Sequence, residues 1–243
     1  MNNIKQEFER EALVLGDDAV IKLNNSSVAL FGVGGVGSYA AEALARAGVG
    51  RIMLIDSDTV SRSNINRQLC ALQSTIGQFK VDVIAERIKD INPDTTVICR
   101  RDFVLPDNID TFSLEDFDFV IDAIDTVSAK IAIIERSLAV GTPSVSCMGT
   151  GNKLDPTAFC VTDISKTNTC PLARVMRREL KKRGINHARV IYSTEEAMTP
   201  KETLSDGNKR SVPGSLSFVP SVAGLIAASE AVKSILKGEK KNG

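Results

Sequence analysis

The sequence contains no tryptophan, and aromatic residues make up only 5% of its 243 residues. A surface that binds single-stranded nucleic acid by base stacking needs several aromatic rings, so this class of site has little material here. Acidic and basic residues are equal in number, 30 of each. Net charge therefore favours no charged partner, and a nucleic-acid site would have to come from a local cluster of cations.

Paired cysteines are also missing. The five cysteines are scattered, and no two of them form a Cys-x-x-Cys pair. We therefore expect reduced thiols and no structural zinc site. The N-terminus is polar, without the apolar core of a signal peptide, and the charge-free stretch 211–229 contains two prolines and five serines. These features predict a cytoplasmic protein with no membrane segment.

Apolar runs of strand length alternate with helical patterns over the first 150 residues. The expected strands are 27–31, 51–56, 95–100, 117–122 and 144–148, and the expected helices are 4–23, 36–47, 79–90 and 128–140. This alternation predicts an α/β fold with a Rossmann-like, mostly parallel sheet and helices on both faces. We expect residues 1–150 to form a nucleotide-binding domain that includes the N-terminal helix. The alternation weakens in residues 151–243, which we expect to pack on the same sheet and bind the substrate.

A glycine-rich turn joins the first expected strand to the next helix. It contains Gly32, Gly34, Gly35 and Gly37. Glycines in this context let backbone N–H groups approach a phosphate, and the helix N-terminus adds a partial positive charge. Asp56 follows Gly37 by nineteen residues, where a dinucleotide-binding fold places the carboxylate that binds ribose. Taken alone, these features favour an enzyme that uses NAD or FAD.

The residues after Asp56 favour ATP instead. The loop 56–68 is polar and includes Arg67, and Lys80 opens the next helix. A nicotinamide needs a flat, mostly apolar slot, whereas a triphosphate needs cations on its β and γ oxygens and often a carboxylate that holds Mg²⁺. Asp122 and Asp125, at the end of the fourth strand, are candidates for that carboxylate. The sequence therefore predicts ATP and Mg²⁺ as cofactors and adenylation of a carboxylate as the reaction.

Five motifs in order strengthen this interpretation. They are the glycine turn, Asp56 with Asp58, Asn64 with Arg67 and Gln68, Gly77 with Lys80, and Asp125. In these motifs the chain resembles the ubiquitin-activating-enzyme-like adenylating family, whose bacterial members include ThiF and MoeB. The resemblance implies that Asp56 binds the ribose, that Asn64, Arg67 and Lys80 bind the phosphates, and that Asp125 holds the metal. It also implies a homodimer in which Arg10 reaches the ATP site of the partner subunit. Without this resemblance, a solvated helix face is the favoured explanation of Arg10, because arginine is usually exposed.

The second half resembles one branch of this family. Residues 170–180 read C-P-L-A-R-V-M-R-R-E-L, a block similar to the tRNA threonylcarbamoyladenosine dehydratase (TcdA) branch. This resemblance implies ATP-dependent closure of the threonylcarbamoyl side chain on adenosine 37 of tRNA, with loss of water, and a sulfur-transfer protein as a further candidate partner. The alternative is adenylation of the C-terminus of a ubiquitin-like or sulfur-carrier protein, as in ThiF and MoeB. The missing zinc cysteines count against that alternative.

A basic stripe supports a nucleic-acid substrate. Arg174, Arg177, Arg178 and Lys181 recur at helical spacing, so they share one helix face that suits the phosphates of tRNA. The alternative is a solvated helix whose charge is balanced elsewhere. Cys170 precedes this helix and is a candidate nucleophile, since nearby cations lower a thiol pKa. A structural role is the alternative for Cys170, because ring closure requires no thioester. The sequence leaves open whether the polar segment 194–209 is ordered without substrate.

Overall fold

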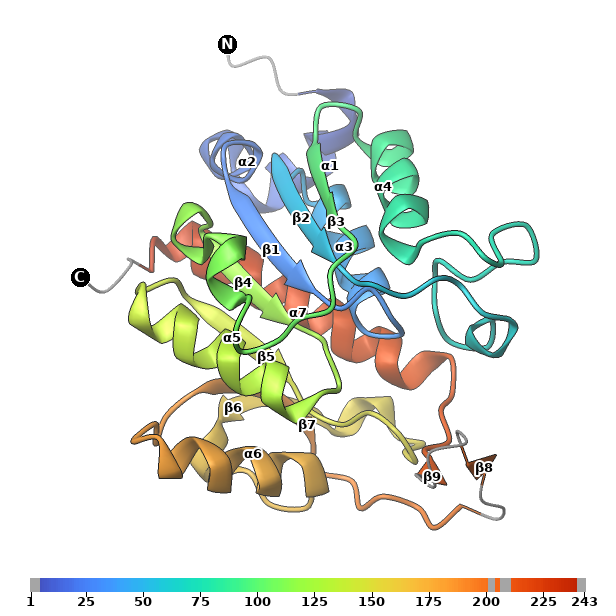
Figure 1. The fold of residues 1–243 in the computed structure, drawn as a ribbon. Coiled ribbons are helices and arrows are strands. Elements are labelled where there is room, and N and C mark those ends of the chain that lie inside the picture. Colours follow the sequence, from blue (N-terminus) through green and yellow to red (C-terminus); the bar gives the residue numbers. More distant parts are fainter. Residues whose placement is uncertain (1–4, 201–203, 206–210, 240–243) are drawn as a thin grey trace.

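The fold is built on one seven-stranded sheet, seen in a computed structural model that describes residues 5–200, 204–205 and 211–239. The strand order is β3-β2-β1-β4-β5-β7-β6 (Figure 1). The strands are β1 (Ser27–Phe31), β2 (Arg51–Ile55), β3 (Thr96–Arg100), β4 (Phe119–Asp122), β5 (Ser144–Cys147), β6 (Phe159–Asp163) and β7 (Arg189–Ser193). A separate two-stranded sheet pairs β8 (Leu204–Ser205) with β9 (Ser211–Val212). All neighbours in the large sheet are parallel except β6, which pairs antiparallel with β7.

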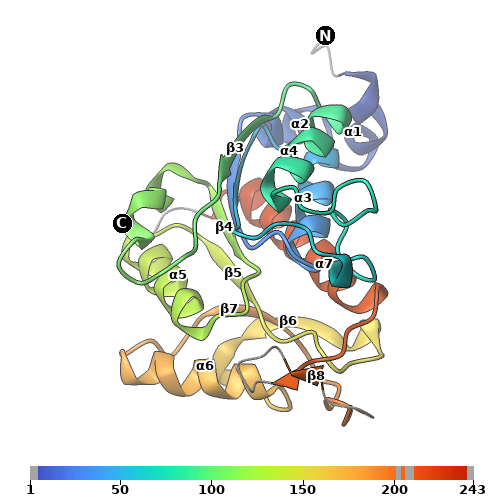
Figure 2. The same ribbon diagram turned by 45° about the vertical axis from the view of Figure 1, so that its right-hand side comes forward.

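Helices cover both faces of the sheet (Figure 2). They are α1 (Glu9–Leu15), α2 (Asp17–Asn24), α3 (Gly37–Arg46), α4 (Lys80–Ile91), α5 (Val127–Ala139), α6 (Pro171–Lys182) and α7 (Phe218–Lys237). Successive side chains of a strand point to opposite faces. Accordingly Val28 and Leu30 of β1 pack with α3, α4 and α7, whereas Ala29 and Phe31 pack with α5. The predicted fold, a mostly parallel Rossmann-like α/β sheet, is confirmed.

Short 3₁₀ helices occupy several connections. They are Gln6–Phe8, Arg62–Asn64, Ile109–Phe112, Leu114–Asp116, Pro156–Ala158 and Ile164–Lys166. The nine strands and helices expected before residue 150 are present within two residues of their predicted bounds, except the first helix. That helix is divided into α1 and α2 because Gly16 adopts a φ of 86°, a backbone conformation that interrupts a helix.

Residues after 150 continue the same sheet and cover it. Strands β6 and β7 extend the sheet beyond β5, and α6 packs beside α5. Helix α7 returns across the molecule to lie against α3, as both views show (Figures 1 and 2). This packing is close, because a Cβ added to Gly224 would lie 2.2 Å from the carbonyl oxygen of Val36.

Helix α7 is long and apolar enough to cross a membrane by length and composition. Half of its most apolar window is nevertheless buried inside the protein, and its buried face consists mainly of small residues against α3. The helix therefore serves as a core helix of the sheet. The prediction that the charge-free stretch 211–229 is buried holds for the part from Val219 onward, whereas residues 213–218 are mostly exposed.

Candidate functional site

A cleft of about 570 Å³ lies at the carboxyl ends of the parallel strands. Parallel α/β folds place their ligands at this edge, and the volume lies within the range of small-molecule sites. One end of the cleft is lined by the glycine turn, Asp56, Asp58, Arg67 and Lys80. The other end is lined by residues 148–151, Leu172 and residues 213–215. The first set contains charged side chains, whereas the second set, called the neutral end below, contains none.

The glycine turn is shaped by close backbone contacts. Gly32 has a φ of 86°, and a Cβ added there would lie 2.7 Å from the carbonyl oxygen of Ala123. A Cβ on Gly37 would lie 1.8 Å from the carbonyl oxygen of Gly32. Neither position tolerates a side chain, so the strand turns directly into α3. The N-terminus of α3 then faces the cleft, as phosphate binding requires. Gly34 and Gly35 line the cleft, whereas Gly37 supports the turn from behind.

Asp56 is fixed at the end of β2. Its carboxylate accepts hydrogen bonds from the backbone N–H groups of Val33, at 2.7 Å, and Asp58, at 2.9 Å. Burial raises the pKa of Asp56, while Lys80 and the two N–H groups act in the opposite direction. These contacts tie Asp56 to the glycine turn, so a ligand that lies along the turn meets this carboxylate.

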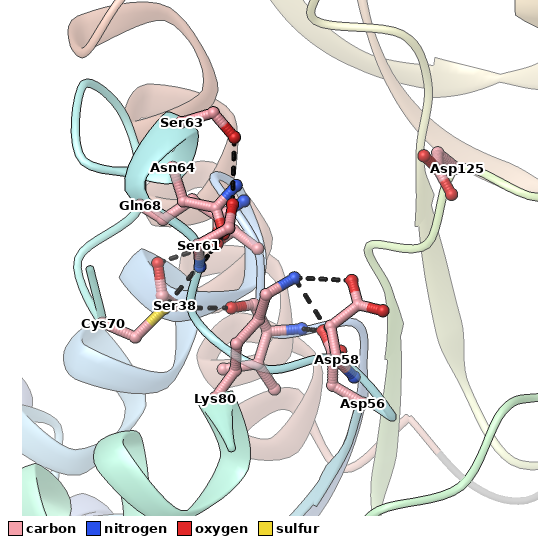
Figure 3. Close-up of polar contacts among 12 residues, drawn as sticks. Ser38, Asp56, Asp58, Ser61, Ser63, Asn64, Gln68, Cys70, Lys80 and Asp125 are labelled. Atoms are coloured by element: carbon pink, nitrogen blue, oxygen red, sulfur yellow. Dashed lines mark hydrogen bonds and ion pairs between the residues drawn. The ribbon is translucent and has the colours of Figure 1, made fainter. Parts of the chain in front are cut away.

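Lys80 begins α4, and its ammonium group faces into the same corner of the cleft (Figure 3). The side chain is 6% exposed, and Nζ lies 2.7 Å from Oδ2 of Asp58 and 4.0 Å from Oδ1 of Asp56. A buried ammonium is stable only when it is paired. An anionic ligand in the cleft would therefore meet a positive charge that is already held in place.

The loop between β2 and α4 carries Asn64, Arg67 and Gln68, all of which line the cleft. Asn64 fixes the loop, because its side chain accepts a hydrogen bond from the backbone of Ser61 at 3.0 Å. Arg67 Nη1 donates to the carbonyl of Ser63 and to Oδ1 of Asn66. A guanidinium has five donors, so further N–H groups of Arg67 are available to a phosphate. The structure therefore brings Arg67 and Lys80 together at one cleft, as the sequence predicted.

The two aspartates predicted at the end of the fourth strand, Asp122 and Asp125, have different environments. Asp125 is exposed and lines the cleft, across from Lys80 (Figure 3). Asp122 does not line the cleft, and the prediction that it contacts the nucleotide or metal is wrong. It is 1% exposed and lies 3.0 Å from Nζ of Lys130, whose side chain is fully buried. Ser146 also donates to it. Its carboxylate therefore forms an ion pair with Lys130 in the core and does not face a ligand in the cleft.

A metal in this cleft would rely on few protein ligands. No group of three or more His, Cys, Asp or Glu side chains that could hold a metal occurs in the described part of the chain. Mg²⁺ commonly binds through one or two carboxylates together with substrate phosphates and water. Asp125 is an exposed carboxylate across from the cations and accepts one long hydrogen bond, from the Thr126 hydroxyl at 3.5 Å, so it fits that mode of binding.

Sequence reasoning missed the wall formed after β3. Asp102, Phe103 and Val104 line the cleft there, and Phe103 is 57% exposed. Their position could have indicated the site. They follow the carboxyl end of β3, which pairs with β2, and Asp56 comes directly after β2. Sequence reasoning also assigned no site role to residues 213–215, which reach the cleft from far along the chain.

The basic stripe lies on α6, whose N-terminal turn contributes Leu172 to the neutral end of the cleft. Arg174, Arg178 and Lys181 are exposed. Arg177 differs, because its Nη1 donates to the carbonyl and hydroxyl of Thr167 at 2.7 and 2.6 Å. Three of the four predicted cations are therefore presented to solvent, and Arg177 braces the loop before the helix.

Cys170 is 1% exposed and packs in the core between α5, α6 and β7. Cys170 is buried and does not line the cleft, so this geometry gives the predicted nucleophile no support. Cys147 lies at the floor of the cleft, but burial raises the pKa of its thiol to about 12. Cys147 therefore provides no activated thiolate in this structure.

Arg10 lies on α1 and is exposed, away from the cleft of its own chain. The same short helix exposes Leu13 and Val14, which are 88% and 81% accessible. Burial raises the pKa of its neighbour Glu11. The geometry thus leaves an arginine beside an uncovered apolar surface.

The chain is similar to known proteins over nearly its whole length. The model of the ThiF family matches residues 8–242. The tRNA threonylcarbamoyladenosine dehydratase of Bacillus subtilis is 46% identical over 95% of each chain, and that of Escherichia coli is 36% identical over 98% of this chain and 97% of its own. The crystal structure of the Escherichia coli dehydratase, TcdA, in complex with ATP has a TM-score of 0.89 at 36% identity and covers 100% of this chain and 99% of that chain. Its complex with AMP has a TM-score of 0.88 at 38% identity and covers 98% of this chain and 96% of that chain.

Proposed function

The chain belongs to the ThiF family, and we propose that it is an ATP-dependent tRNA threonylcarbamoyladenosine dehydratase. One observation carries the proposal: similarity to the dehydratases extends over nearly the whole of both chains, including the half that contains α6. The phosphate end of the cleft is suited to adenylation in general. The choice of substrate would depend on the second half of the chain, residues 151–243.

The ATP orientation follows from the walls of the cleft. The loop after β3 would contact the adenine, and Asp56 would accept hydrogen bonds from the ribose hydroxyls. The phosphates would then run along the glycine turn toward Arg67 and Lys80. Relatives crystallised with ATP and AMP support a nucleotide at this site. With this orientation the neutral end of the cleft would receive the substrate carboxylate that attacks ATP.

The first step is adenylation. A carboxylate oxygen of the threonyl group attacks the α-phosphorus, the bond to the β-phosphate oxygen breaks, and pyrophosphate leaves with both electrons of that bond. Lys80, Arg67 and Asn64 would stabilise the negative charge that develops on the phosphates. Asp125 would hold Mg²⁺, which when bound neutralises phosphate charge. A free carboxylate is a poor electrophile, because oxide would have to leave. Adenylation supplies AMP as the leaving group instead.

The second step is ring closure. The neighbouring carbamoyl group attacks the activated carbonyl carbon and loses a proton, and AMP leaves. Attack within one molecule has an entropic advantage when the side chain is held in a reactive geometry. No enzyme nucleophile is required, which agrees with the buried position of Cys170.

The tRNA would approach along α6. Leu172 lines the neutral end of the cleft, and the exposed Arg174, Arg178 and Lys181 follow it along the same helix. A modified nucleoside in the cleft would therefore place the adjoining phosphates near these cations. ATP and tRNA substrates are consistent with a cytoplasmic enzyme. A sulfur-transfer protein remains a predicted further partner.

The homodimer would complete the site. The exposed Leu13 and Val14 are suited to burial against a second copy. No residue of α1 lines the cleft of its own chain, so a twofold arrangement could bring Arg10 of the partner subunit to the ATP phosphates. In that position its guanidinium would add to the charge supplied by Arg67 and Lys80.

Pyrophosphate exchange tests the substrate class. ATP formation from labelled pyrophosphate should require tRNA that bears linear threonylcarbamoyladenosine, and unmodified tRNA is the matched control. A carrier protein ending in Gly-Gly should have no effect. Exchange that responds to the carrier and ignores the tRNA would replace the proposal with the ThiF and MoeB type of activity.

A further inference from the structure

Asn152 adopts a backbone conformation that is unusual for its residue type. Its φ is 57°, and it follows Gly151, which lines the neutral end of the cleft. Left-handed backbone is disfavoured for residues with a Cβ, although asparagine adopts it more readily than most. Such a conformation persists where surrounding contacts fix it, and functional sites are common locations.

The contacts of Asn152 join three segments of the chain. Its backbone N–H donates to the carbonyl of Gly214 at 2.7 Å, and its side-chain Oδ1 accepts from the N–H of Gly214 at 2.6 Å. Its own carbonyl accepts from the N–H of Met198 at 2.7 Å. In this left-handed conformation both the backbone N–H and the side chain of Asn152 bond to Gly214.

Packing reinforces these bonds. A Cβ added to Gly151 would lie 2.7 Å from Cβ of Pro213, so the turn 213–215 rests directly on the backbone before Asn152. On its other side the turn is held by Asn66, whose Nδ2 donates to the carbonyl of Ser215 at 2.9 Å. Asn66 also accepts from Arg67. The turn 213–215 therefore bridges the loop after β5 and the loop that carries the phosphate-binding arginine.

All three residues of this turn line the cleft at its neutral end. We propose that Asn152 is a positioning residue that fixes the turn 213–215 as the wall against which the modified nucleoside is placed, so that its carboxylate faces the α-phosphate. This inference rests on the proposed function. It assigns substrate placement to the neutral end, whereas nucleotide binding belongs to the charged end.

Three variants separate this role from a general structural one. Asn152→Gly keeps the left-handed backbone but removes the Oδ1 acceptor. Asn152→Asp keeps an acceptor oxygen and is the matched control. Gly151→Ala displaces Pro213 without removing a hydrogen bond. For each variant the ATP dissociation constant is measured by titration, and KM and kcat for modified tRNA are measured by product formation.

We expect Asn152→Gly to raise KM for tRNA about five-fold, the effect of losing one net hydrogen bond, with the ATP dissociation constant unchanged. Gly151→Ala should show the same pattern, and Asn152→Asp should stay within about two-fold of wild type. An unchanged KM for tRNA in Asn152→Gly would overturn the inference. Equal losses of ATP and tRNA affinity with a lowered Tm would also overturn it.

Hydrogen exchange provides a readout that does not depend on activity. The amide of Gly214 should exchange faster in Asn152→Gly and at the wild-type rate in Asn152→Asp. If wild-type protein leaves the tRNA unchanged, the proposed function fails in that control. Exchange at Gly214 then still decides whether Asn152 fixes the turn, and equal exchange in all proteins would contradict it.

Discussion

Lys80 has a buried positive charge whose partners belong to the same corner of the cleft. Its Nζ lies 2.7 Å from Asp58, so the group is held where the phosphates would lie. We predict that Lys80→Met lowers the rate of pyrophosphate release by roughly 10²- to 10³-fold, because the stabilisation of developing phosphate charge is lost. Lys89→Met, an exposed substitution on the same helix, is the control. A Lys80→Met variant with near wild-type turnover would rule out this role.

The reactivity of each cysteine thiol also depends on the immediate surroundings of that residue. Burial raises the pKa of Cys147 to about 12 and that of Cys70 to about 11. At pH 8 both groups are therefore protonated, and Cys170 is inaccessible. Iodoacetamide treatment of native protein at pH 8 should label Cys99 before these three, because Cys99 is exposed even though burial raises its pKa as well; peptide mass spectrometry reads the result. Rapid labelling of Cys170, or inactivation that follows its labelling, would restore it as a candidate nucleophile.

At the scale of elements, α6 is predicted to supply the electrostatic part of tRNA affinity. Replacing Arg174, Arg178 and Lys181 with glutamine should weaken tRNA binding and reduce the slope of log K against log salt by about one for each lost phosphate contact. A variant with glutamine at Lys22, Lys89 and Lys237, which are exposed and lie outside α6, loses the same number of charges and is the control. Binding and slope that match wild type would show that the tRNA follows another surface.

Helices and strands were predictable because each has a local signal. Buried parallel strands are continuous apolar runs, and the glycine turn marks the start of α3. Asp122 and Asp125 show where this signal ends. Both follow the same strand, but the fully buried Lys130 of α5 removes Asp122 from the cleft. The sequence does not show whether the partner of such a carboxylate lies in the core or at the cleft.

The neutral end of the cleft shows a second limit. It combines residues 148–151, Leu172 and residues 213–215, which only the folded sheet brings together. None of these segments contains the charged groups from which a site is normally recognised. The phosphate end was predictable because Asp56, Arg67 and Lys80 occur in one stretch of sequence with characteristic spacing.

At the scale of the whole molecule, the proposed homodimer predicts complementation. Arg10→Ala and Lys80→Met should each be inactive alone. In mixed dimers the Arg10→Ala protomer keeps Lys80 and receives Arg10 of the partner subunit, so an equal mixture should recover about a quarter of wild-type activity. Dimers are re-formed by mixing after mild dissociation, and turnover is measured. Activity equal to the sum of the separate variants would show that Arg10 does not act across the interface.

The proposed reaction has one direct test, the mass of the nucleoside. The protein is incubated with ATP, Mg²⁺ and tRNA bearing linear threonylcarbamoyladenosine, and the tRNA is then digested under conditions that preserve the cyclic product. The expected result is a modified nucleoside lighter by one water, formed only when ATP is present and absent with Lys80→Met. An unchanged nucleoside mass from wild-type protein that binds ATP would contradict the account.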